Sequence, residues 1–170
     1  MSAEGSVRQT PPAVGTPAPD FELEDQHGTP LRLSALRGRP VLLVFFPHAF
    51  TPTCTGELCA VRDELAETDE QASGLEGVQV VGVSCDPSPA LRVFAQREGI
   101  TYPLLSDFWP HGDVSRAYGV FFEPRGFATR GTFLLDAEGL VRWSVVNGPG
   151  EARDPADYRA AVAALAEPVP

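Results

Sequence analysis

Residues 41–46 are all apolar, so this segment has no polar face to turn toward solvent. A strand of this kind is typical of the centre of a sheet that helices cover on both faces. The run is far shorter than the ~20 residues that a membrane-spanning helix needs, and Pro47 ends it. A central strand buried on both sides therefore favours the layered α/β architectures.

The segments around this strand predict the rest of a mixed sheet. Apolar and polar residues alternate over residues 21–33 on either side of a turn at residues 25–28, which predicts an N-terminal hairpin. Further along, hydrophobic patterns and turn residues predict helices and strands, namely a helix from Cys54, a strand at 78–83, helices at 88–99 and 113–118, a hairpin of 132–135 with 140–146, and a last helix near Asp154. We therefore predict an α/β, thioredoxin-like fold, with a mixed central sheet and helices on both faces.

Length and composition predict one folded domain. Residues 1–19 hold four prolines and two glycines without a hydrophobic pattern, and predict a flexible N-terminal lead-in. Residues 20–170 then form a single domain, because a chain of 170 residues with 43% hydrophobic residues can bury one core. The first residues lack the basic and apolar regions of a secretory signal, so we expect a cytoplasmic location.

The charges exclude several classes of function. The chain carries 13 basic and 23 acidic residues, a formal charge of −10, so its field repels nucleic acid and anionic membranes, and neither is expected as a partner. All the basic residues are arginines, which leaves no lysine for a Schiff base or a P-loop. The cysteines and histidines show neither CxxC nor HExxH spacing, so we expect no metal.

Cys54 is the first candidate for chemistry. It follows the buried strand and a proline-containing loop, and lies in the first turn of the predicted helix. Unpaired N–H groups at a helix start favour thiolate over thiol, and the thiolate is the nucleophile. Cys54 also continues the apolar stripe of the helix, so from its position alone it is equally well interpreted as a small buried hydrophobic residue.

Pro47, Thr51 and Cys54 have the spacing PxxxTxxC, which resembles the active-site signature of peroxiredoxins. The residues at 20–23, 82–86 and 130–133 resemble the same family, so the likeness extends over nearly all of residues 19–165. The resemblance implies a cytoplasmic thiol peroxidase that reduces hydrogen peroxide and organic hydroperoxides without metal, haem or flavin.

The resemblance also implies a role for each site residue. Cys54 would attack the peroxide and become a sulfenic acid, and Arg130 would hold the thiolate and the peroxide oxygens. Thr51 would align the peroxide with the sulfur, and Pro47 would shield the sulfur from water. Glu57 would either join an arginine network or act as a plain helix-capping carboxylate.

We predict that Cys59 resolves the sulfenic acid through an intramolecular disulfide with Cys54, with an external thiol as the alternative. Cys59, five residues after Cys54, has the spacing of the resolving cysteine in the PrxQ or bacterioferritin-comigratory group. In a regular helix these cysteines lie ~7.5 Å apart along the axis and about 140° apart around it, so a disulfide requires local unwinding, which Gly56 would ease. Residues 106–112 and 117–120 instead resemble the alkyl hydroperoxide reductase E group, which implies resolution by an external thiol. Cys85 is better interpreted as a buried small residue.

The reductant implied by the resemblance is thioredoxin, a glutaredoxin-like protein or a low-molecular-weight thiol. Phe108, Trp109 and His111 form an aromatic cluster that would either contact a second copy in a homodimer or pack on itself. A disulfide reductase would need two cysteines separated by two residues, which the chain lacks. A peroxide sensor or holdase that uses Cys54 stoichiometrically is the remaining alternative.

Overall fold

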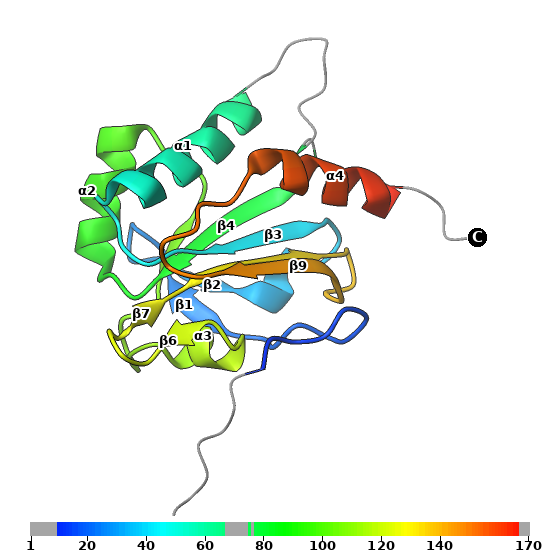
Figure 1. The fold of residues 1–170 in the computed structure, drawn as a ribbon, viewed down its shortest axis with the longest axis horizontal. Coiled ribbons are helices and arrows are strands. Elements are labelled where there is room, and N and C mark those ends of the chain that lie inside the picture. Colours follow the sequence, from blue (N-terminus) through cyan, green and yellow to red (C-terminus); the bar gives the residue numbers. More distant parts are fainter. Residues whose placement is uncertain (1–9, 67–74, 76, 167–170) are drawn as a thin grey trace, which may run out of the picture.

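The computed structural model describes residues 10–66, 75 and 77–166. It contains a five-stranded mixed sheet, of which Figure 1 labels β3, β4 and β9. Its strands, in the order β5-β4-β3-β8-β9, are β5 (Leu104–Ser106), β4 (Gln79–Ser84), β3 (Val41–Phe45), β8 (Arg130–Leu135) and β9 (Val141–Asn147). Strand β3 is parallel to β4 and antiparallel to β8. The predicted thioredoxin-like α/β fold is thus confirmed.

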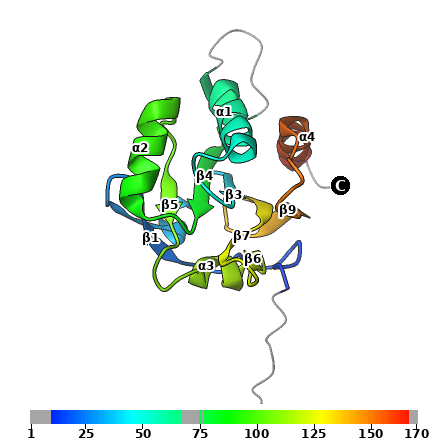
Figure 2. The same cartoon turned by 60° about the vertical axis from the view of Figure 1, so that its left-hand side comes forward.

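The sheet is covered on both faces, as the apolar character of residues 41–46 predicts. Leu42, Val44 and Phe46 pack into one core, beneath the helices α1 (Pro52–Ala66), α2 (Ser88–Glu98) and α4 (Pro155–Ala166). The alternate residues of β3 pack into a second core on the opposite face. That face is covered by the hairpin β1 (Glu22–Glu24) and β2 (Pro30–Arg32), the 3-10 helix η1 (Leu33–Leu36) and α3 (Asp113–Ala117) (Figure 2).

The strands that the sequence did not predict are short. They are β5 at the sheet edge and the small pair β6 (Phe121–Phe122) and β7 (Phe127–Ala128), each of two or three residues. Such lengths are too short for an alternating pattern to stand out. Residues 1–9 of the predicted lead-in lie outside the described residues. Further along it, the N–H groups of Gly15 and Ala18 donate to the carbonyls of Val141 and Gly139, so this part of the chain lies against the turn before β9.

The topology brings two distant segments to one edge of the sheet. Strand β3 ends at Phe45, and α1 begins at Pro52 after a short loop at that edge. Strand β8 runs the opposite way, with Thr132 opposite Val44, so its first residue, Arg130, lies at the same edge. Within the described residues, no helix is both long enough and apolar enough to cross a membrane.

Candidate active site

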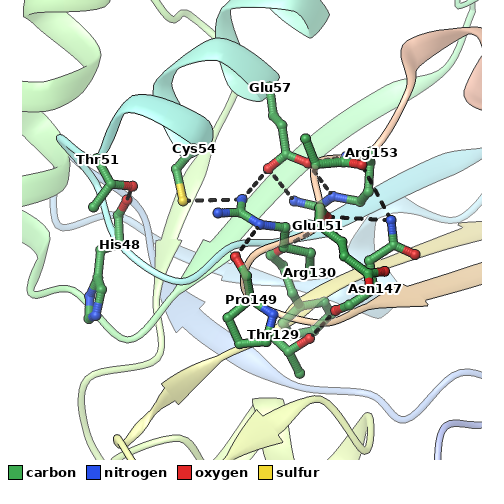
Figure 3. A network of polar contacts seen from close by, with 12 residues as sticks. His48, Thr51, Cys54, Glu57, Thr129, Arg130, Asn147, Pro149, Glu151 and Arg153 are labelled. Atoms are coloured by element: carbon green, nitrogen blue, oxygen red, sulfur yellow. Dashed lines mark hydrogen bonds and ion pairs between the residues drawn. The ribbon is translucent and has the colours of Figure 1, made fainter.

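Cys54 is the third residue of α1 and is completely buried. The N–H groups in this first turn precede the regular hydrogen bonds of the helix, which leaves a positive end of the helix dipole at this point. Arg130 faces the sulfur from β8: its Nη1 donates to Sγ of Cys54 over 3.4 Å (Figure 3). A cysteine sulfur is therefore held between a helix start and a guanidinium group.

Arg130 is fixed on two sides besides its contact with the sulfur. Its Nε donates to the carbonyl oxygen of Pro149 over 2.8 Å, and its Nη1 forms an ion pair with Oε1 of Glu57. The side chain is 4% exposed, so these contacts lie away from solvent. The guanidinium group therefore cannot swing away from Cys54 without leaving buried partners unpaired.

Glu57 joins two arginines beneath the first turn of α1. Its Oε2 accepts hydrogen bonds from the backbone N–H of Arg153 at 2.7 Å and from Nε of Arg153 at 2.9 Å. Burial alone would raise the pKa of Glu57, but the hydrogen bonds and charge of Arg153, together with the charge of Arg130, hold it below its ordinary value. Glu57 thus belongs to an arginine network and does not cap the helix. Two cations and one carboxylate leave one positive charge beside the sulfur.

Arg153, two residues before α4, is a site residue that no sequence pattern indicated. Its side chain is 1% exposed. Nη1 donates to the carbonyl oxygens of Phe45 at 2.7 Å and Gly131 at 2.9 Å, and to the hydroxyl of Thr132 at 3.1 Å. One side chain thus links the ends of β3 and β8 to Glu57 of α1. Arg153 lies in a loop rich in glycine and proline, where no local pattern indicates that an arginine is buried. Its partner Glu57 lies 96 positions earlier in the chain.

The loop between β3 and α1 is anchored from both ends. Pro47 is buried at the end of β3, and the hydroxyl of Thr51 donates to the carbonyl oxygen of His48 over 3.0 Å. The N–H of Ala49 donates to Oδ2 of Asp86 over 2.9 Å, which ties the loop to the segment after β4. Thr51 directly precedes the helix that carries Cys54 (Figure 3).

The structure does not bring Cys59 next to Cys54; all three cysteines are free thiols. Sγ of Cys59 lies toward α2 and donates to Oε2 of Glu98 over 3.6 Å. Burial raises the pKa of the Cys59 thiol; Arg62 acts in the opposite direction, and Glu98 raises it further. Burial, with the carboxylate of Asp107 as a further cause, raises the pKa of Cys85 to about 12.

The aromatic cluster predicted at residues 108–111 is partly self-packed. The rings of Phe108 and His111 lie 6.1 Å apart, and His111 is hydrogen-bonded to the carbonyl oxygen of Gly126. Trp109 is 79% exposed, and the homodimer contact stays a prediction. Within the ranges that the structure describes, no group of three or more His, Cys, Asp or Glu is arranged to hold a metal ion.

Comparisons with known proteins point to one family. Residues 14–144 match the model of the AhpC/TSA family. The chain is 48% identical over 153 residues to alkyl hydroperoxide reductase E of Mycobacterium tuberculosis, covering 89% of this chain and 97% of the relative. It is 35% identical over 137 residues to peroxiredoxin Bcp of Escherichia coli, covering 77% and 83%. The crystal structure of peroxidoxin BcpB from Mycobacterium tuberculosis superposes with a TM-score of 0.75 at 36% identity, over 91% and 98% of the chains.

Proposed function

The chain belongs to the AhpC/TSA family and is a thiol-dependent peroxidase, and we propose that Cys54 is the residue that reacts with the peroxide. The observation that carries this proposal is the 3.4 Å contact between Nη1 of Arg130 and the buried sulfur of Cys54. A fixed cation beside a sulfur at a helix start stabilises a thiolate. Cys59, in contrast, contacts the carboxylate of Glu98.

In the first step, the Cys54 thiolate attacks the terminal oxygen of the hydroperoxide. A sulfur–oxygen bond forms, the oxygen–oxygen bond breaks, and the leaving oxygen takes a proton and departs as water or an alcohol. The sulfur is oxidised by two electrons and becomes a sulfenic acid. Arg130 stabilises the negative charge that develops on the oxygens, because its guanidinium is already in place. The hydroxyl of Thr51 donates its hydrogen bond to the carbonyl oxygen of His48, so its oxygen is left to accept a hydrogen bond from the peroxide.

The proposed substrates are hydrogen peroxide and organic hydroperoxides. The name of the mycobacterial relative, alkyl hydroperoxide reductase E, supports the organic class. Buried Pro47 limits the access of water to the Cys54 sulfur, so that water does not solvate the thiolate. We propose that the enzyme works as a homodimer in the cytoplasm, where it contributes to redox homeostasis.

For the second half of the cycle we propose two routes. Cys59 forms a disulfide with Cys54 after the first turns of α1 unwind, or an external thiol attacks the sulfenic acid directly. Gly56 supports the first route, because it is exposed and lies between the two cysteines. The proposed reductants are thioredoxin, a glutaredoxin-like protein or a low-molecular-weight thiol.

Peroxide consumption by the purified protein, with dithiothreitol in excess, tests the role of Cys54. We expect the parent to turn over many equivalents and Cys54→Ser to consume no more than the buffer, whereas Cys85→Ala retains the parent rate. A Cys54→Ser protein that consumes peroxide as fast as the parent contradicts the assignment. A parent that stops after about one equivalent supports a stoichiometric sensor instead.

A further inference from the structure

We propose that Glu98 is a positioning residue that holds the Cys59 thiol against α2 and so slows its attack on the oxidised sulfur of Cys54. The inference rests on the proposed function, in which Cys59 is one of two routes of resolution. It starts from the contact between Sγ of Cys59 and Oε2 of Glu98, at 3.6 Å. In this contact the thiol is the donor and the carboxylate the acceptor, so the hydrogen bond requires the protonated sulfur.

The other groups around Cys59 do not replace this contact. Arg62, on the same helix, is the cation nearest in sequence, but its Nη2 pairs with Asp63 at 2.8 Å and its Nη1 donates to the backbone carbonyl of Glu98. Tyr102 directs its hydroxyl to the carbonyl oxygen of Leu58 over 2.8 Å. Burial raises the pKa of Cys59, Arg62 lowers it, and both Glu98 and Asp63 raise it.

The position of Glu98 is not explained by the stability of its helix. Glu98 is the last residue of α2, and Gly99 follows in the left-handed conformation that ends the helix. A carboxylate at a helix C-terminus opposes the helix dipole and disfavours the helix. The carboxylate is instead turned to the neighbouring helix, where it accepts the hydrogen of Cys59.

The same contacts hold the turn of α1 that carries Cys59. Leu58 and Arg62 are hydrogen-bonded to Tyr102 and to the backbone of Glu98, so the turn that carries Cys59 is tied to α2 and to the segment before β5. Gly56 has no atom within 4 Å of the place where a Cβ would stand. A Cys54–Cys59 disulfide therefore requires the first turns to unwind and the contacts of Glu57 with Arg130 and Arg153 to break, while Cys59 stays where Glu98 holds it.

The step that Glu98 slows is balanced without any other reactant. The Cys59 thiolate attacks the Cys54 sulfur, a sulfur–sulfur bond forms, and the sulfur–oxygen bond of the sulfenic acid breaks. The hydroxide that leaves combines with the proton that Cys59 released, so the product is one disulfide and one water. Both sulfurs end at the disulfide level. Because the thiolate is the attacking form, a contact that requires the thiol lowers the rate.

The first experiment measures Cys59 alone. In a Cys54→Ser background, iodoacetamide labelling of Cys59 is followed against pH by mass spectrometry. Glu98→Gln is expected to move the labelling midpoint to lower pH, while Glu98→Asp stays close to the parent. Asp63→Asn removes a carboxylate that does not contact the sulfur, and is the matched control with a smaller shift. An unchanged midpoint in Glu98→Gln, or an equal shift in Asp63→Asn, overturns the proposal.

The second experiment keeps Cys54 and measures formation of the Cys54–Cys59 disulfide at pH 7 after one equivalent of hydrogen peroxide. For each tenfold gain in thiolate, we expect Glu98→Gln to form the disulfide about threefold faster, because a less basic thiolate is also less nucleophilic. Equal rates in both proteins, or a slower rate in Glu98→Gln, overturn the role of Glu98 alone. Absence of the disulfide from both proteins overturns the resolving role of Cys59 as well, while peroxide consumption still tests Cys54 separately.

Discussion

Helix α1 carries one cysteine in its first turn, Cys54, and another near its middle, Cys59. The charged groups that face these two sulfurs have opposite signs. Cys54 is buried against the guanidinium of Arg130. Cys59, five residues later, donates its hydrogen to the carboxylate of Glu98. The Cys54 end is tied to β8 and to the loop before α4, whereas the Cys59 end is tied to α2. Two identical side chains thus have opposite charge environments, set by the neighbouring elements β8 and α2.

The greatest loss of stability is predicted for a variant of the arginine network that holds the Cys54 end of α1. Arg153→Met removes the main partner of Glu57 and leaves a buried carboxylate short of donors, so we expect a loss of about 3–5 kcal/mol in the free energy of unfolding. Urea denaturation measures it. The control is Arg159→Met, which removes a half-exposed ion pair with Glu64 and should cost about 1 kcal/mol or less. Similar losses in both variants would mean that the arginine network does not hold this end.

A second variant tests the charge beside the sulfur of Cys54. Arg130→Met is expected to slow the oxidation of Cys54 by peroxide about 10²- to 10³-fold, because a preorganised donor is lost. Rapid mixing with hydrogen peroxide, followed by mass spectrometry of the Cys54 peptide, measures the rate. The pH profile of Cys59 labelling should not move, since Arg130 lies at the other end. An unchanged oxidation rate would contradict the claim that the charge of Arg130 distinguishes the Cys54 end from the Cys59 end.

The pH dependence of stability gives a third test. The folded-state pKa of Glu57 lies below its ordinary value, so this carboxylate stabilises the fold fully above the unfolded pKa of about 4.3, and the contribution is lost as the pH falls through the folded pKa. Glu57→Gln should therefore be less stable than the parent by about 1–3 kcal/mol at pH 7. The difference should shrink below about pH 4. Urea denaturation from pH 7 to pH 3 measures both curves, and a constant difference contradicts the assignment.

The smallest effect is expected at the third cysteine, which lies outside α1. Because burial and the carboxylate of Asp107 raise the pKa of Cys85 to about 12, only about 10⁻⁴ of this thiol is ionised at pH 8. Cys85→Ala should leave the oxidation rate of Cys54 unchanged. In the parent, iodoacetamide at pH 8 should label Cys59 and leave Cys85 unlabelled. Labelling of Cys85 ahead of Cys59 would show that burial does not determine the relative reactivity of these two thiols.

The sequence predicted those features that repeat along the chain or that match a motif. The apolar run at residues 41–46 predicted a strand covered on both faces, and the resemblance carried by Pro47, Thr51 and Cys54 predicted the pairing with Arg130. Arg153 was missed because burial of a loop arginine depends on how four distant segments pack. The contact of Glu98 with Cys59 was missed for the same reason, since it joins two helices 39 residues apart.

Gly56 bears on the fate of the sulfenic acid that we propose for Cys54. Alanine would fit there without a clash and would strengthen the helix by up to about 1 kcal/mol. Glycine thus makes the helix less stable at the point where the proposed disulfide requires local unwinding. A more stable helical turn would lengthen the lifetime of the sulfenic acid, which a second peroxide molecule can convert irreversibly to sulfinic acid. If the proposed disulfide forms, the missing methyl group at Gly56 would favour resolution over irreversible oxidation.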